Sequence, residues 1–122
     1  MAFEITDELL NHLSELISSN NDNAITSLFE EVHFADIAEV LEELDFEDAI
    51  FIIKLLDSEK TSEILTELDE NIREKILENL SEKEIAEEVA EMDSDDAADI
   101  IGELSEERQE RVINAIQDDE LA

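Results

Sequence analysis

From Asp45 to Leu80 the sequence is DFEDAIFIIKLL, DSEKTSEILTEL and DENIREKILENL, three consecutive segments of twelve residues. Each segment begins with Asp, a favourable N-cap residue, and carries apolar residues seven, eight and eleven positions later. At about 100° per residue, these three positions form one apolar stripe on a helix surface. Each segment therefore predicts one short amphipathic helix of about ten residues, with almost no loop before the next.

The same register continues outward in both directions. All positions of the apolar stripe hold apolar residues except one, Glu88. All but one of the cap positions hold good N-cap residues, His33 being the exception; the cap positions are Asn21, His33, Asp45, Asp57, Asp69, Ser81, Asp93 and Ser105. Because helices this short are unstable alone in water, they must stack on one another. The sequence predicts an all-α fold, an α-solenoid of short helices with a period of about twelve residues.

Three regions follow from this register. Residues 1–20 form an N-terminal helix and loop, the helix having one apolar side made of Phe3, Leu9, Leu10, Leu13, Leu16 and Ile17. The clearest loop is expected at residues 18–23. Residues 21–116 form the helical-repeat domain, and residues 117–122 form a frayed acidic tail.

Charge excludes several functions. The 122 residues include 38 Asp and Glu but only 7 Lys and Arg, a net charge of −31. Nucleic-acid binding through phosphate contacts requires a basic surface, and an anionic membrane would repel this chain. The longest apolar run, residues 49–53, is far too short to span a bilayer, so no membrane insertion is expected. The absence of Cys leaves the redox compartment open, and with no basic, apolar leader the expected location is the cytoplasm.

Two motifs carry a family resemblance: HFADIAE at residues 33–39 and EMDSDDAADIIGEL at residues 91–104. They resemble the cytoplasmic N-terminal domain of MgtE-type magnesium transporters over about residues 21–116. The resemblance implies a right-handed superhelix that precedes a pair of CBS domains and a transmembrane channel, which can form a homodimer. It also implies that the domain binds Mg²⁺ together with the CBS domains to close the pore. The family usually has Pro where this chain has Phe34.

Candidate metal ligands lie in the second motif. Asp95 and Asp99 are four residues apart, so they share one helix face, opposite the apolar stripe. Mg²⁺ keeps several waters and is typically held by one or two carboxylates, which such a pair can supply. The resemblance implies that Asp95, Asp99 and Glu63 hold Mg²⁺ at the boundary with the CBS domains. Asp96 and Asp93 are weaker candidates, and Asp93 is expected to be a helix cap.

Other chemistry finds little support. The spacing of Asp95, Asp96 and Asp99 also occurs in enzymes that use diphosphates, but these need a deep pocket and basic residues. The histidines, His12 and His33, lack a second ligand at helical spacing, so a zinc site is not expected. No nucleophile lies next to a base in the pattern of a catalytic pair. The chain is not expected to be an enzyme.

The resulting hypothesis is a magnesium-sensing regulatory domain of a magnesium transporter. Its acidic surface repels a second acidic domain, and Mg²⁺ joins the two. Two alternatives remain open: an acidic helical-repeat scaffold that binds a basic partner protein, and a mimic of DNA. If neither the Mg²⁺ role nor a partner applies, the carboxylates form a solvated helix face.

Overall fold

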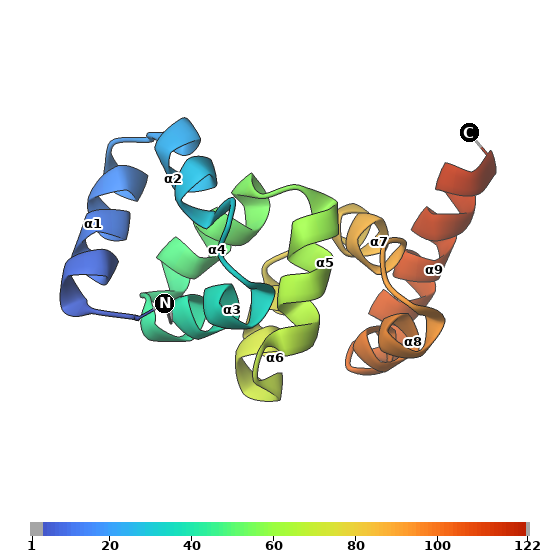
Figure 1. Ribbon diagram of the computed structural model, residues 1–122. Helices are drawn as coiled ribbons and strands as arrows, with labels where there is room; N and C mark the ends of the chain where they lie inside the picture. Colours follow the sequence, from blue (N-terminus) through green and yellow to red (C-terminus); the bar gives the residue numbers. More distant parts are fainter. Residues whose placement is uncertain (1–3, 122) are drawn as a thin grey trace.

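The structure is a computed structural model that describes residues 4–121, with side chains described for residues 4–118. Its regular elements are all helices, which confirms the all-α prediction (Figure 1). In chain order the helices are α1 (Asp7–Ser18), α2 (Asp22–Phe29), α3 (Phe34–Glu43), α4 (Phe46–Leu55), α5 (Ser58–Glu67), α6 (Glu70–Glu78), α7 (Glu82–Val89), α8 (Ser94–Gly102) and α9 (Glu106–Leu121).

Helices α2 to α9 each begin one residue after a cap position of the twelve-residue register. At the start of α7, Ser81 and Glu84 form the expected capping box, each side chain accepting from the other residue's backbone N–H. His33 also acts as a cap, because its Nδ1 accepts from the backbone N–H of Ala35 at 3.1 Å. The imidazole thus replaces the usual hydroxyl or carboxylate, and the register holds even where the residue type departs from it.

The two ends of the chain differ from expectation. The loop after α1 is shorter than residues 18–23, because Ser18 still belongs to α1 and α2 begins at Asp22. Asn20 has a positive φ of 55°, and the next N–H, that of Asn21, donates back to the carbonyl of Leu16, which closes α1 within two residues. At the other end, residues 117–121, expected to be frayed, are the last five residues of α9. Phe3 and Ala122 lie outside the described residues.

Alternate helices stack. Helix α3 packs against α5, α5 against α7 and α7 against α9, while α4 packs against α1, α2 and α3, and α8 against α7 and α9. Figure 1 shows the result as an elongated array with α1 at one end and α9 at the other. The accessible surface of 7526 Å² exceeds the roughly 6,700 Å² expected for a compact monomer of this mass, which fits an open array. The right-handed superhelix stays a prediction.

The core consists mainly of the predicted stripe. At position eight, the residues from α2 to α7 are at most 3% exposed (Phe29, Leu41, Ile53, Leu65, Leu77 and Val89). Ile113, at the same position of α9, is 43% exposed, because α9 is the terminal helix of the described array. Among the described residues, no helix combines the length and apolar character needed to cross a membrane.

Candidate functional site

Helix α8 carries the acidic motif on its exposed side. Asp95, Asp96 and Asp99 are all exposed, whereas Ile100 of the same helix is 3% exposed and faces the core. Asp95 and Asp96 lie in the first turn, where the positive end of the helix dipole stabilises negative charge. The helix therefore presents Asp95 and Asp99, one turn apart, to solvent or to a docking surface.

Asp93 occupies the N-cap position of α8, as expected. Its backbone is extended there (φ −61°, ψ 151°), but its side chain makes no capping hydrogen bond. Asp45, the N-cap of α4, likewise makes no side-chain capping hydrogen bond. A cap position in this array therefore does not require one. The exposed Asp93 carboxylate is thus a further acidic group near the α8 N-terminus.

Asp96 and Asp99 border a hollow of about 90 Å³ that Thr66 of α5 and Arg73 of α6 also line. The guanidinium of Arg73 donates to the carbonyls of Leu65 and Leu68 at 3.2 and 2.9 Å. Its positive charge makes the hollow itself unfavourable for a metal ion. A cation held by the α8 carboxylates is better placed on the solvent side of the helix.

Glu63 lies on α5 and is exposed. It precedes Thr66 by one turn, and the Thr66 hydroxyl donates to the Glu63 carbonyl at 2.7 Å, but Glu63 does not line the hollow that Asp96 and Asp99 border. Within the described part of the chain, no group of three or more His, Cys, Asp or Glu side chains could hold a metal ion. The donor set that remains, an exposed carboxylate pair, fits a half-site for Mg²⁺ whose other ligands are waters or groups of a partner.

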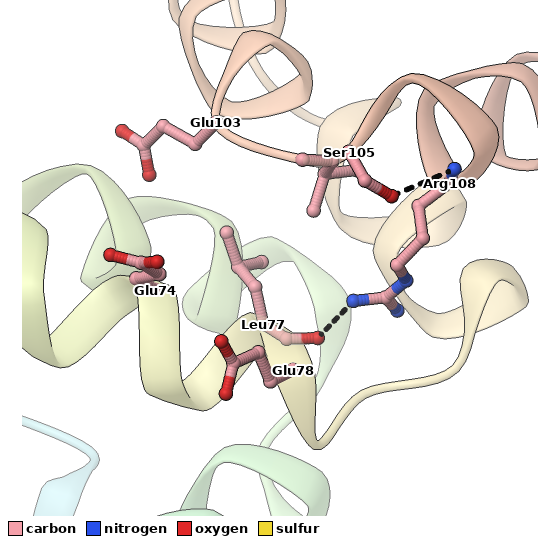
Figure 2. Close-up of a pocket in the computed structure, with 7 residues that line it drawn as sticks. Glu74, Leu77, Glu78, Glu103, Ser105 and Arg108 are labelled. Atoms are coloured by element: carbon pink, nitrogen blue, oxygen red, sulfur yellow. Dashed lines mark hydrogen bonds between the residues drawn. The ribbon is translucent and has the colours of Figure 1, made fainter.

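A larger hollow, of about 320 Å³, lies between α6 and the corner joining α8 to α9 (Figure 2). Glu74 and Glu78 of α6 and Glu103 at the end of α8 bring carboxylates to it, and Arg108 of α9 lies at its edge. The Arg108 side chain donates to the carbonyl of Leu77 at 2.9 Å. The hollow thus combines acidic walls with a cation that the chain itself supplies.

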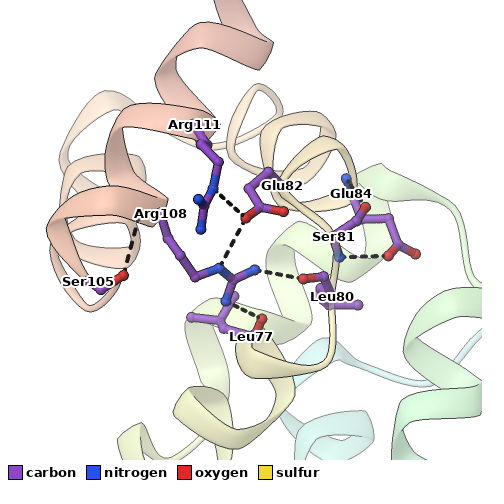
Figure 3. A network of polar contacts seen from close by, with 8 residues as sticks. All are labelled: Leu77, Leu80, Ser81, Glu82, Glu84, Ser105, Arg108 and Arg111. Carbon is purple, nitrogen blue, oxygen red and sulfur yellow. Dashed lines mark hydrogen bonds and ion pairs between the residues drawn. The ribbon is translucent and has the colours of Figure 1, made fainter.

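Arg108 belongs to a polar network that fixes α9 to the end of α6 (Figure 3). Its guanidinium also donates to the carbonyl of Leu80 at 2.7 Å and lies 3.5 Å from the carboxylate of Glu82. Arg111 donates to the same carboxylate at 3.0 Å. A backbone hydrogen bond at Glu82 and the hydrogen bond from Arg111 lower the pKa of Glu82. The network is structural, because it satisfies helix-end carbonyls that have no partner within their own helix.

Glu88 is a residue whose significance the sequence reasoning missed. It is only 6% exposed, and its Oε2 has no hydrogen-bond partner in the described structure. Burial, with smaller contributions from Glu84 and Glu87, raises the pKa of Glu88 to about 8. The sequence signal was present, since Glu88 is the one polar residue at the apolar stripe positions.

Comparison with known families gives one match. The family model of the MgtE intracellular N domain matches residues 32–122, three quarters of the chain, beginning and ending later than the range 21–116 over which the motifs suggested a resemblance. A search of curated proteins finds no match. Domains of the matched family belong to magnesium transporters. With its all-α fold, its twelve-residue register and this match, the chain belongs to the MgtE intracellular N domain family.

Proposed function

We propose that this domain senses Mg²⁺ for a magnesium transporter. Its surface carboxylates Asp95 and Asp99, with Glu63 and Asp96, bind Mg²⁺ and dock the domain on CBS domains of the same longer polypeptide, which closes the channel. The domain then lies on the cytoplasmic side of the inner membrane, and the channel domain forms the homodimer. The observation that carries the proposal is the exposed Asp95–Asp99 pair on α8 of a chain that belongs to this family.

The driving force is electrostatic. A net charge of −31 on 7526 Å² places neighbouring charges about 15 Å apart on average, nearly twice the ~8 Å screening length of physiological salt, so the repulsion is appreciable where acids cluster. A second acidic surface is repelled unless a divalent cation lies between the two. Mg²⁺ can shift the equilibrium toward the docked state only if it binds that state more tightly, and a site completed by both surfaces meets this condition.

The coordination chemistry suits a shared site. Mg²⁺ prefers oxygen ligands in an octahedron and gives up its waters reluctantly. One or two carboxylates of α8 with several retained waters therefore make a weak half-site on this domain. Asp96 contributes negative charge on α8 itself, Glu63 is a further exposed acid on α5, and the CBS surface supplies the remaining ligands. The proposal assigns no reaction to the domain.

A Mg²⁺ titration followed by thermal unfolding tests the proposal. At constant ionic strength, Mg²⁺ raises the Tm of the wild type by more than it raises that of the Asp95→Asn/Asp99→Asn variant. The matched control is Glu106→Gln/Glu110→Gln, which removes an exposed pair of acids at the same spacing on α9. This control should retain the wild-type response. Equal responses in all three proteins would show that Asp95 and Asp99 are not the Mg²⁺ ligands.

A further inference from the structure

The carbonyl ends of successive helices in this array have a repeated relationship with arginine. At the end of α5, the carbonyls of Leu65 and Leu68 accept from Arg73, which also pairs with Glu103. These carbonyls lie eight and eleven positions after the cap residue Asp57. One guanidinium thus satisfies two helix-end carbonyls and one carboxylate.

The end of α6 repeats this arrangement. Leu77 and Leu80 are the residues eight and eleven positions after their cap, and their carbonyls accept from Arg108 at 2.9 and 2.7 Å. Arg108 also lies 3.5 Å from the carboxylate of Glu82. At the ends of two consecutive helices, an arginine is therefore bound in the same way. Its guanidinium donates to the carbonyls of positions eight and eleven and pairs with one carboxylate.

The end of α4 has an equivalent pair of carbonyls with acids nearby, but no arginine donates to them in the described structure. Ile53 and Leu56 lie eight and eleven positions after Asp45, and their carbonyls accept only a single hydroxyl in the described structure, that of Thr61, at 3.2 and 3.5 Å. They line a hollow of about 80 Å³ together with acids of α7. We call it the Glu88 hollow; its lining includes Ile53, Leu56, Thr61, Glu84, Glu87 and Glu88.

Glu88 is the acid that distinguishes this hollow. It is 94% buried, lines the hollow and leaves Oε2 without a partner in the part of the chain that the structure describes. Lys54 of α4 also lines the hollow, but its ion pair in the described structure is with Glu84, with 3.9 Å between Nζ and Oε1, and its side chain is 47% exposed. A buried carboxyl without a partner costs stability, and such costs are typical of functional positions.

We infer that the Glu88 hollow is a receptor for an arginine side chain supplied by a protein partner. The planar guanidinium matches a carbonyl pair and a carboxylate together, as Arg73 and Arg108 do in the same molecule. Three glutamates line the hollow, but among the described residues they do not form a group that could hold a metal ion, so a guanidinium fits the hollow better than a chelated metal.

The arginine must come from outside the chain. The sequence contains Arg73, Arg108 and Arg111, and each is already paired, Arg73 with Glu103 and the other two with Glu82. A second copy of these 122 residues has the same three arginines in the same pairs. The net charge of −31 also favours a basic partner over an acidic one.

Binding is coupled to proton release. Because burial raises the pKa of Glu88 to about 8, this carboxyl is mostly protonated at neutral pH. The arriving guanidinium favours the ionised form, so the carboxyl releases its proton to solvent as the ion pair forms. At pH 7 the release approaches one proton per arginine bound, and it falls toward zero at pH 9, where the carboxyl is already ionised.

The test uses the full chain and N-acetyl-arginine amide as the probe, with N-acetyl-lysine amide as its comparison, both at constant ionic strength. Amide chemical shifts are followed by NMR in the wild type, in Glu88→Gln and in the control Glu67→Gln, an exposed acid of α5 outside the hollow. We expect saturable shifts in residues 53–61 and 84–88 of the wild type and of the control. Glu88→Gln should bind about tenfold more weakly, and lysine amide more weakly than arginine amide.

Three outcomes would overturn the inference. The first is equal binding of arginine amide to the wild type and to Glu88→Gln. The second is equal binding of the lysine and arginine probes. The third is displacement of arginine amide from the same amides by MgCl₂ at the same ionic strength, which would make the hollow a metal site. None of these measurements involves Asp95 or Asp99, so failure here and failure of the proposed Mg²⁺ sensing are separate results.

Discussion

Arg73 of α6 and Glu103 at the end of α8 form a largely buried ion pair, with their side chains 14% and 17% exposed. The Arg73 Nε lies 2.9 Å from Oε1 of Glu103, and hydrogen bonding to Glu103 raises the pKa of Arg73 above its usual value. The same guanidinium satisfies the carbonyl end of α5. One side chain thus links three helices that are not held together by extensive direct packing.

Removing the Arg73 guanidinium should destabilise the array. Arg73→Met leaves the Glu103 carboxylate without its partner and two helix-end carbonyls without a donor. We expect a loss of about 2–4 kcal/mol in the free energy of unfolding, measured by urea denaturation. Arg111→Met is the control, because the Arg111 side chain is 57% exposed and its pair with Glu82 should contribute less than about 0.5 kcal/mol. Equal losses in the two variants would contradict this role of Arg73.

Replacing Glu88 with an apolar residue should stabilise the domain in a pH-dependent manner. The pKa of Glu88 is about 8 in the folded protein against an ordinary value of 4.5, so the folded state binds more protons than the unfolded state between these values. Stability is therefore lost as pH rises from about 4.5 to about 8. The cost at pH 7 is roughly 3 kcal/mol, and it disappears below pH 4.5.

Glu88→Leu removes that cost and restores the apolar pattern of the stripe. Urea denaturation at pH 5, 6, 7 and 8 should show the variant gaining on the wild type at each step. Glu67→Leu serves as the control, because the Glu67 side chain is exposed on α5 outside the Glu88 hollow and its removal changes the net charge equally. Stability curves of wild type and Glu88→Leu that stay parallel across this pH range would refute the raised pKa.

Loss of the capping box at the start of α7 should weaken the array measurably. Ser81→Ala removes the hydroxyl that accepts from the Glu84 N–H at 3.0 Å, and the expected loss is about 1 kcal/mol in the free energy of unfolding. Ser94→Ala, one residue after the cap of α8, should change it by no more than about 0.5 kcal/mol. If the two variants unfold at the same urea concentration, the capping box makes no contribution to the free energy of unfolding.

Without Mg²⁺, the Asp95–Asp99 pair should be a mild liability. Like charges four residues apart on a helix repel by about 0.2–0.5 kcal/mol. Asp99→Asn removes this repulsion and leaves Asp95 at the positive end of α8, so it should raise Tm slightly in a chelating buffer, and 1 M NaCl should reduce the difference by screening. If the pair binds Mg²⁺, adding Mg²⁺ should make the Tm of the wild type higher than that of the variant. This reversal distinguishes a ligand pair from a solvated face. An unchanged order at every Mg²⁺ concentration would favour the solvated face.

The secondary structure could be predicted almost completely because the signals are local. Cap residues every twelve positions and an apolar stripe at three fixed offsets determined where α2 to α8 begin and which side of each is buried. The loop after α1 and the end of α9 were predicted less well, since neither lies inside the repeat. After α1, a positive φ at Asn20 ends the helix, and at the other end α9 continues through residue 121.

The candidate site, too, could be predicted only in part from the sequence. Helical phase alone predicted that Asp95 and Asp99 lie on the exposed side of α8. It could not predict that Arg73 shares a hollow with Asp96 and Asp99, because these residues meet only when α6 and α8 are placed side by side. Helical phase also could not show whether Glu63 lies beside the acids of α8 or apart from them on the surface.

By itself, therefore, the sequence determined the helices, their caps, their buried faces and the family, because each depends on residue type and spacing within one twelve-residue unit. The tertiary structure decided which helix ends meet which side chains. Arg108 donates to carbonyls at the end of α6, Arg73 pairs with Glu103, and Glu88 shares a hollow with the end of α4. Each of these relationships joins units that are far apart in the sequence and meet only when the helices stack. Long-range contacts of this kind leave no periodic signal in the chain, apart from a single acid at a position where every other unit has an apolar residue.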